Sequence, residues 1–286
     1  MCENKTILLT GGTSGIGLAT ARALVRHGAT VIVTGRNRDR CAAAASDVSA
    51  ADWIAADFAD LSQVAALADE FKRRYGRLDV LVNNAGAVFQ QRRLTPQGLE
   101  TTFVVNHLAP FLLTTRLLEI LVSSAPARIV NVTSVAHTME HLDFDDLQLT
   151  HGFRPFRAYG RTKLANVMLT NELARRLAGT GVTANAVHPG LARTRIGAKG
   201  GALVRLGWAL IQLRYRSAVV EPEQAANAVV RLACSPEVEC VTGAYFDGEA
   251  VAEPSVESRD PDLCARLWSV SEELVRGVTP VARATG

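Results

Sequence analysis

The stretch Thr10-Gly11-Gly12-Thr13-Ser14-Gly15-Ile16-Gly17 decides the fold. It follows a short apolar run, Lys5–Thr10, and it precedes a helical pattern over Leu18–His27 and a second apolar run over Thr30–Thr34. Strand, glycine turn, helix and strand form the unit in which a glycine motif binds a dinucleotide. The spacing is G-x-x-x-G-x-G, and the bare backbone lets a pyrophosphate approach the positive end of the helix. The alternative interpretation is an ordinary glycine-rich turn.

Further short apolar runs alternate with helical patterns along the rest of the chain, as in a parallel sheet with crossover helices. They predict strands over Asp52–Ala56, Leu78–Val82, Arg128–Thr133, Val182–His188 and Ala244–Phe246, and helices that include Leu61–Tyr75 and about Gly98–Ser123. We therefore expect an α/β fold, a single Rossmann-type doubly wound parallel sheet of about seven strands with helices on both faces. No linker or repeat interrupts the pattern, so residues 1–286 are predicted to form one NADP-binding domain.

The end of the second strand indicates which dinucleotide binds. An acidic residue here would hold a ribose 2′-hydroxyl, whereas Arg36 would accommodate a 2′-phosphate, with Arg38 able to assist. The sequence thus favours NADP (NADPH) over NAD, and the alternative is a solvent-facing arginine. Asp57 and Phe58 follow the third strand, where Asp57 is placed to meet the adenine edge or to cap the next helix.

Tyr159-Gly160-Arg161-Thr162-Lys163 carries the chemistry that we expect. Tyr and Lys at i, i+4 project from one helix face, and a cation beside a phenol lowers its pKa towards the working range. Ser134 follows the fifth predicted strand, and Asn83-Asn84-Ala85-Gly86 follows the fourth, where a cofactor crevice would lie. Asn106 is polar within an apolar helix, so it should have a partner; kink-stabilising and catalytic interpretations both fit it.

Two segments allow several interpretations. Residues 135–157 hold three histidines and three aspartates, for which a polar loop over the pocket is favoured over a metal site, and no metal is predicted. Around 191–220 we expect a substrate lid. Its apolar positions within 203–213 have helical spacing, which fits a lid over an apolar substrate, a membrane-surface helix or core packing.

Bulk composition narrows the class of protein. Net charge is +3, from 31 basic and 28 acidic residues, so nothing favours a nucleic-acid partner. The five cysteines are scattered and odd in number, which predicts free thiols in a reducing compartment and neither a disulfide framework nor a zinc site. The chain shows no signal segment and no run near the ~18 apolar residues of a membrane span, which predicts a cytoplasmic protein without a transmembrane segment.

These motifs, in this order, resemble the short-chain dehydrogenase/reductase family over about residues 5–276. The wide gap between Ser134 and Tyr159, and the surroundings of Asn106, resemble its retinol dehydrogenase and WW-domain oxidoreductase branch. The resemblance implies that Tyr159 transfers a proton to or from the substrate oxygen while Ser134 hydrogen-bonds that oxygen. Lys163 would hold the nicotinamide ribose and lower the tyrosine pKa, and Asn106 would hold a water that links Lys163 to solvent.

The resemblance also implies a cofactor path along the chain. The residues that would line it are Gly11, Thr13, Ser14, Gly15, Ile16, Gly17, Arg36, Asp57, Phe58, Asn83, Ala85, Gly86, Tyr159, Lys163, Pro189, Gly190 and Thr194.

We therefore expect an NADP-dependent oxidoreductase that reduces a ketone or aldehyde, or oxidises a secondary alcohol. Its partner would be a small, lipophilic carbonyl or alcohol substrate, and a homo-oligomer is possible because the family often pairs through the helices of Asn106 and Tyr159. One alternative is a catalytically silent protein that senses NADP. Another is a nucleotide-sugar epimerase or dehydratase, whose usual glycine spacing and longer carboxyl-terminal domain are absent.

Overall fold

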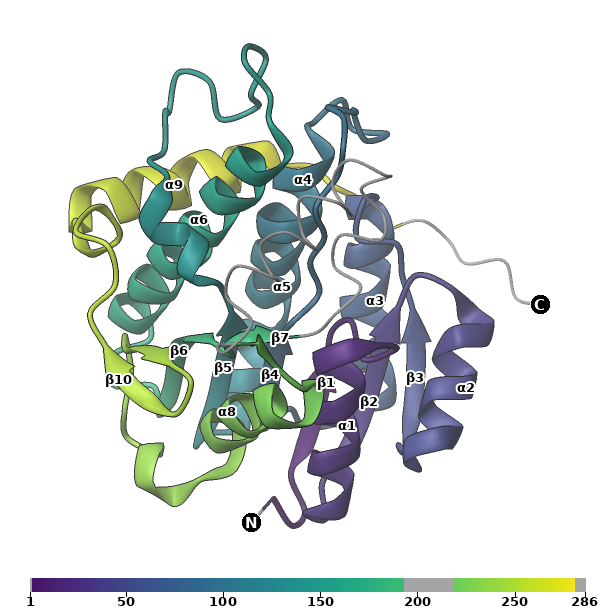
Figure 1. The fold of residues 1–286 in the computed structure, drawn as a ribbon. Helices are drawn as coiled ribbons and strands as arrows, with labels where there is room; N and C mark the ends of the chain where they lie inside the picture. The colour runs from purple at the N-terminus through teal and green to yellow at the C-terminus, as the bar shows by residue number, and fades with distance from the viewer. Residues whose placement is uncertain (1, 193–218, 281–286) are drawn as a thin grey trace.

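One eight-stranded sheet organises the chain in the computed structural model, which describes residues 2–192 and 219–280 (Figure 1). The strand order is β10-β9-β6-β5-β4-β1-β2-β3, and every neighbouring pair is parallel except β10 with β9. The strands are β1 Thr6–Leu9, β2 Thr30–Gly35, β3 Asp52–Ala55, β4 Val80–Asn83, β5 Ala127–Val132, β6 Val182–His188, β9 Tyr245–Asp247 and β10 Ala250–Ala252. The predicted Rossmann-type fold is confirmed, and the prediction of about seven strands omitted β10, a short antiparallel edge strand.

Helices cover both faces of this sheet, as Figure 1 shows. On one face lie α1 (Gly15–Arg26), α2 (Arg38–Val48) and α8 (Pro222–Cys234), which share one apolar cluster with the sheet. On the other face lie α3 (Leu61–Arg74), α5 (Ala109–Ser123) and α6 (Pro155–Arg176), with α9 (Pro261–Leu274) packed against α6. Both faces of the central strands are therefore buried, which explains their continuous apolar sequences.

The helix predicted over Gly98–Ser123 is interrupted by a π-helical turn. A short α4 (Thr101–Phe103) leads into the π-turn η1 (Val104–Leu108) and then into α5. By length and composition Thr101–Ser123 could span a membrane, so the expectation that no run approaches such a span was wrong. Its apolar window is 67% buried in the structure, because it packs as a core helix on the sheet beside α3 and α6.

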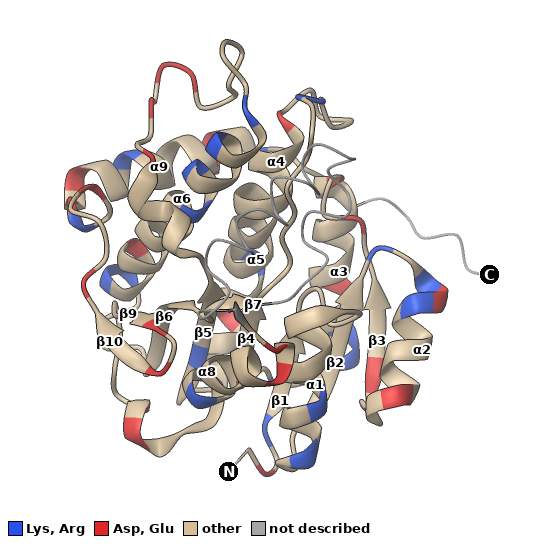
Figure 2. Cartoon of the chain, in the orientation of Figure 1, with Lys and Arg blue, Asp and Glu red and all other residues tan. Residues whose placement is uncertain are grey.

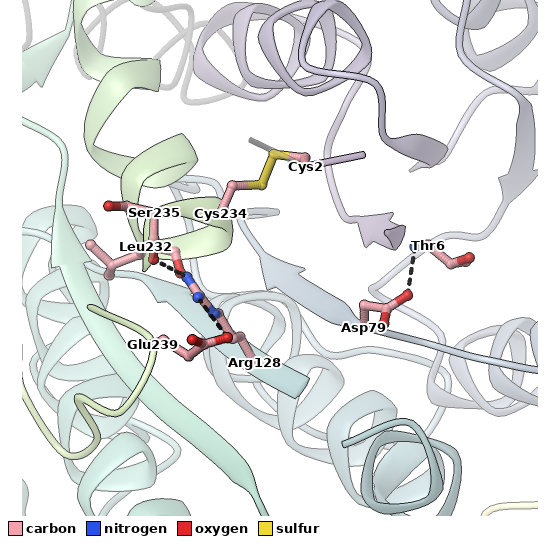
Figure 3. Close-up of a disulfide and its surroundings, with 8 residues drawn as sticks. All are labelled: Cys2, Thr6, Asp79, Arg128, Leu232, Cys234, Ser235 and Glu239. Carbon is pink, nitrogen blue, oxygen red and sulfur yellow. Dashed lines mark hydrogen bonds and ion pairs between the residues drawn. A yellow bond between two sulfur atoms is a disulfide. The ribbon is translucent and has the colours of Figure 1, made fainter. Parts of the chain in front are cut away.

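The prediction of five free thiols was wrong for two cysteines. Cys2 and Cys234 form a disulfide that ties the segment before β1 to the end of α8, 232 positions later in the chain (Figure 3). Sequence spacing gave no sign of it, since only the packing of α8 beside α1 brings both thiols together. Next to it, buried Arg128 donates hydrogen bonds to the Leu232 and Ser235 carbonyls at 3.1 and 2.8 Å.

The segment predicted to form a lid lies mostly outside the described residues. The structure describes only the two ends of this segment, which form two short parallel strands, β7 (Leu191–Ala192) and β8 (Val219–Val220). The apolar pattern over 203–213 falls within the part that is not described. On α2 and α9, basic and acidic side chains both occur (Figure 2).

Candidate active site

A cleft of about 270 Å³ opens at the carboxyl ends of the parallel strands. This edge is where open α/β sheets bind their ligands. Most of the residues predicted from the sequence line it together. The described lining consists of Gly11, Thr13, Ser14, Gly15, Ile16, Gly17, Gly35, Arg36, Ala56, Asp57, Phe58, Ala59, Asn84, Ala85, Gly86, Ala87, Phe89, Val105, Val132, Thr133, Ser134, Tyr159, Lys163, His188, Pro189, Gly190 and Leu191.

The glycine turn connects β1 to α1 and forms one end of this cleft. Gly11 and Gly15 adopt positive φ angles of 69° and 54°, which side chains rarely tolerate. A Cβ on Gly17 would lie 2.2 Å from the Gly11 carbonyl oxygen. Ser14 caps α1 without a side-chain hydrogen bond, so the first amides of the helix face the cleft without a side-chain acceptor. The turn therefore fits a pyrophosphate, whose oxygens can accept from those amides.

Charged and apolar groups follow the glycine turn at the ends of β2 and β3. Arg36 is exposed on the cleft wall, directly after Gly35. Arg38 instead lies over the Trp53 ring, with its guanidinium carbon 5.3 Å from the ring centroid. Asp57 lines the cleft while its carboxylate accepts from the Ala59 amide at 3.0 Å, so it both faces the pocket and fixes the turn before α3.

At the end of β4 only one asparagine of the predicted pair lines the cleft. Asn83 is buried and donates to Thr114 and Asn131 at 3.0 and 2.9 Å, outside the cleft lining. Asn84 lines the cleft, and its amide donates to the carbonyl oxygens of Thr10 and Gly11 at 2.8 and 3.3 Å. Side chains alternate along a strand, so adjacent residues point to different surroundings. Asn84 thereby braces the glycine turn.

Ser134 and Tyr159 meet at the other end of the cleft, where their side chains lie close enough to interact. Tyr159 is only 7% exposed, and burial raises the pKa of its phenol to about 12, although the interaction with Ser134 opposes the shift. The tyrosine–lysine spacing predicted that Lys163 lowers the pKa of Tyr159. The protein groups around Tyr159 instead raise that pKa. The Lys163 ammonium lies 5.4 Å from the ring centroid, and removing the phenolate from water outweighs its attraction.

Lys163 is buried beneath the cleft and contributes to its lining. Its ammonium donates to the Val132 carbonyl at 2.9 Å, and burial lowers its pKa to about 8. The backbone is fixed as well, because Thr133 Oγ1 donates to the Lys163 carbonyl at 2.9 Å. An ammonium has three N–H donors, so this lysine has capacity for hydroxyl groups in the cleft.

Asn106 lies in the π-turn, fully buried and outside the cleft lining. It exchanges two hydrogen bonds with the backbone of Ala87, at 2.8 and 2.9 Å, and donates to Thr162 Oγ1 at 3.1 Å. A Cβ on Gly86 would lie 3.5 Å from both Asn106 Oδ1 and Lys163 Nζ, so these two groups converge there. The kink-stabilising and catalytic interpretations of Asn106 are therefore compatible.

Residues 135–157 begin with a 3-10 turn, η2 (Val135–Met139), which packs on α6. His137 is buried there, with Nδ1 2.8 Å from the Ser134 carbonyl oxygen. Gly160 permits the contact, because a Cβ there would lie 3.0 Å from the Ala136 carbonyl oxygen. Within the described residues, no three His, Cys, Asp or Glu side chains form a metal cluster.

The last predicted positions follow β6. Pro189 and Gly190 line the cleft, and Gly190 has a φ of 90°. Thr194 lies outside the described residues. Sequence reasoning missed Ala87, Phe89 and Val105, because apolar residues at such positions look like ordinary core.

Comparison with known proteins agrees with this geometry. The family model described as "short chain dehydrogenase" matches residues 5–202. Human "Retinol dehydrogenase 13" is 39% identical over 98% of this chain and 87% of its own length. "Putative daunorubicin C-13 ketoreductase DnrU" of Streptomyces sp. (strain C5) is 38% identical over 95% of this chain and 92% of its own. The crystal structure of an uncharacterised Mycobacterium paratuberculosis protein matches with a TM-score of 0.78 and 30% identity, covering 98% of this chain and 96% of that one. The chain therefore belongs to the short-chain dehydrogenase/reductase family, in its retinol dehydrogenase-like branch, and is an oxidoreductase.

Proposed function

We propose that the protein is an NADP-dependent reductase of ketones or aldehydes. The observation that carries the proposal is the meeting of Ser134, Tyr159 and Lys163 in one cleft with the glycine turn. A nicotinamide bound there supplies the hydride, and the protein supplies position and a proton. Burial keeps the Tyr159 phenol protonated at neutral pH, so it holds a proton that it can give to a carbonyl oxygen as hydride arrives.

Each remaining group has a role that its surroundings support. The Ser134 hydroxyl and the Tyr159 phenol lie together in the cleft, so a carbonyl oxygen held there receives two hydrogen-bond donors as negative charge grows on it. Lys163 holds a ribose hydroxyl with its remaining N–H donors, and its charge stabilises phenolate once the proton has left. The amides at the start of α1 hold the pyrophosphate.

Replacement of the tyrosine tests the reaction. Tyr159→Phe removes one oxygen from a buried site, so we expect folding and NADPH binding to persist while turnover falls by at least about a thousandfold. The assay is NADPH consumption against carbonyl compounds graded by size and polarity, with NADPH fluorescence titration as the binding control. A variant that keeps near-normal turnover would overturn the assignment of the acid. The catalytically silent alternative predicts no turnover in the wild-type protein, and the complete catalytic set does not favour it.

The choice of NADP depends on Arg36. It is exposed on the cleft wall, no described residue forms an ion pair with it, and a guanidinium pairs well with a 2′-phosphate. We expect Arg36→Asp to shift the ratio of kcat/KM for NADPH and NADH towards NADH by roughly a hundredfold. Arg38→Asp is the matched control, because Arg38 lies over Trp53 and should change the ratio little. If Arg36→Asp and Arg38→Asp shifted this kcat/KM ratio equally, the effect would come from the net charge of the protein and not from a contact of Arg36.

We further propose an apolar substrate. Phe89 and Val105 line the cleft, and Val135 and Met139, which follow Ser134, remain 41% and 73% exposed. Exposed apolar side chains beside a reacting centre favour apolar substrate groups. The carbonyl panel tests this, since polar substrates should then have the higher KM. Cytoplasmic location and homo-oligomer formation stay predictions, and the Cys2–Cys234 disulfide is unusual for a reducing compartment.

A further inference from the structure

The carboxyl-terminal helix α9 packs on the side of the π-turn that faces away from the cleft. Trp268 of α9 meets Phe111 of α5 edge to face, with ring centroids 4.9 Å apart. Arg176 of α6 covers the same indole at 4.2 Å from its centroid. These contacts hold α9 across α5 and α6 (Figure 1). The matched family model ends at residue 202, so α9 lies outside the residues that it matches.

One polar contact links α9 to the π-turn. His107 and Ser271 are both fully buried, and His107 Nε2 lies 2.8 Å from Ser271 Oγ. Phe103 and Phe111 flank the imidazole, with ring centroids 5.1 and 6.3 Å away. Burial lowers the pKa of His107 to about 4, so the ring is neutral at physiological pH. The Ser271 hydroxyl is therefore an uncharged partner from α9, and Asn166 of α6 is a second polar neighbour of the ring.

His107 follows Asn106 directly, and the two side chains bind opposite surroundings. Asn106 holds the cleft wall through Ala87 and the tyrosine helix through Thr162. Thr162 Oγ1 in turn donates to the Tyr159 carbonyl oxygen at 2.7 Å. A π-turn is a local departure from α-helical geometry, so its side chains keep their direction only where the surroundings fix it. Asn106 is fixed from the cleft side and His107 from the α9 side.

We propose that Ser271 is a positioning residue for the active site, and that it acts through His107 on the π-turn that directs Asn106. The inference rests on the proposed function, since it concerns the rate of that reaction. Without the hydroxyl, the His107 ring loses its partner on α9 and the turn can rotate or shift. A shift of the turn moves Ala87 and Thr162, and with Thr162 the backbone of Tyr159. Small displacements of an acid from its reacting atom reduce turnover more than binding.

Ser271→Ala tests the proposal with Ser269→Ala as matched control. Ser269 lies on the same helix but is exposed and bonds only its own helix, at the Ala265 carbonyl. We expect Ser271→Ala to lower kcat roughly two- to tenfold through a small displacement of Tyr159, with NADPH Kd unchanged. Ser269→Ala should keep wild-type kcat. Equal kcat in the two variants, each compared as soluble folded protein, would overturn the proposal.

A double-mutant cycle separates positioning from a loss of stability. His107→Phe keeps an aromatic ring between Phe103 and Phe111 but removes the polar partner of Ser271. If the two residues act through their bond, the double variant loses no more kcat than the stronger single variant. Additive losses would overturn the proposal. Ser271→Thr keeps the hydroxyl and should keep most of kcat. If Tyr159→Phe abolishes turnover while Ser271→Ala does not lower it, only this inference fails.

Discussion

The two ends of the cleft are built by opposite means. At the cofactor end, the glycine turn is one contiguous stretch, and it works because side chains are absent where backbone must approach backbone, as at Gly17. At the catalytic end, Ser134 lies between β5 and η2, Tyr159 lies on α6 and Asn106 lies in the π-turn. Buried hydrogen bonds through Thr162 join the last two. The first end is sensitive to any added atom. The second is sensitive to lost contacts, including contacts far from the cleft.

The largest effect on NADPH binding is expected from an added methyl at the cofactor end. In Gly17→Ala the new Cβ would lie 2.2 Å from the Gly11 carbonyl oxygen and 2.6 Å from the Asn84 amide, so the turn must open. We expect NADPH Kd to rise by at least about a hundredfold, or about 3 kcal/mol. Gly76→Ala is the control, since nothing lies within 4 Å of its Cβ position. An unchanged Kd in Gly17→Ala would show that the turn does not need close approach.

An intermediate effect concerns the buried ammonium of the catalytic end. Burial lowers the folded-state pKa of Lys163 to about 8 from 10.5, so between these pH values the unfolded chain binds more protons. Stability from this group therefore rises with pH across that window, and below about pH 8 the buried charge is a constant cost. We expect Lys163→Met to be inactive yet roughly 2 kcal/mol more stable at pH 7, after losing the bond to Val132.

The measurement is the free energy of unfolding by denaturant for both proteins at pH 7 and pH 9.5. The difference between them should shrink as pH rises, because wild-type Lys163 then becomes neutral. Groups that titrate in both proteins cancel in this difference. A gap that stays constant, or a variant that is less stable at pH 7, would contradict a buried and charged Lys163.

The smallest effect is expected from Gly160→Ala, which applies to the catalytic end the same glycine-to-alanine change as Gly17→Ala at the cofactor end. In Gly160→Ala the Cβ would lie 3.0 Å from the Ala136 carbonyl oxygen and 2.7 Å from Glu140 Cγ, so η2 must move away from α6. Ser134 precedes η2 and should move with it, which lowers kcat about tenfold, or about 1.4 kcal/mol, with NADPH Kd within twofold. Adding Glu140→Ala removes one of the two clashes and should restore part of kcat. If Gly160→Ala raised the Kd for NADPH and left kcat unchanged, the two ends of the cleft would not differ in the way described here.

Local patterns predicted most of this molecule. The glycine turn, the alternation of apolar runs and helices, and the tyrosine–lysine spacing were sufficient for the fold and for the tyrosine and lysine in the cleft. Predictions failed where a neighbour in space decides. Asn84 and not Asn83 faces the cleft, and burial outweighs the ammonium in setting the pKa of Tyr159.

The sequence by itself determined which groups we propose for the chemistry, because helical and strand periodicities are local and place side chains on faces in advance. Only the tertiary structure decided what surrounds them. Cys2 meets Cys234 and His107 meets Ser271 across 232 and 164 positions of the chain, distances over which no local periodicity extends. Desolvation likewise depends on everything that packs around a group. The pKa values of Tyr159 and Lys163 are therefore set by the folded structure and not by the Tyr-x-x-x-Lys motif alone.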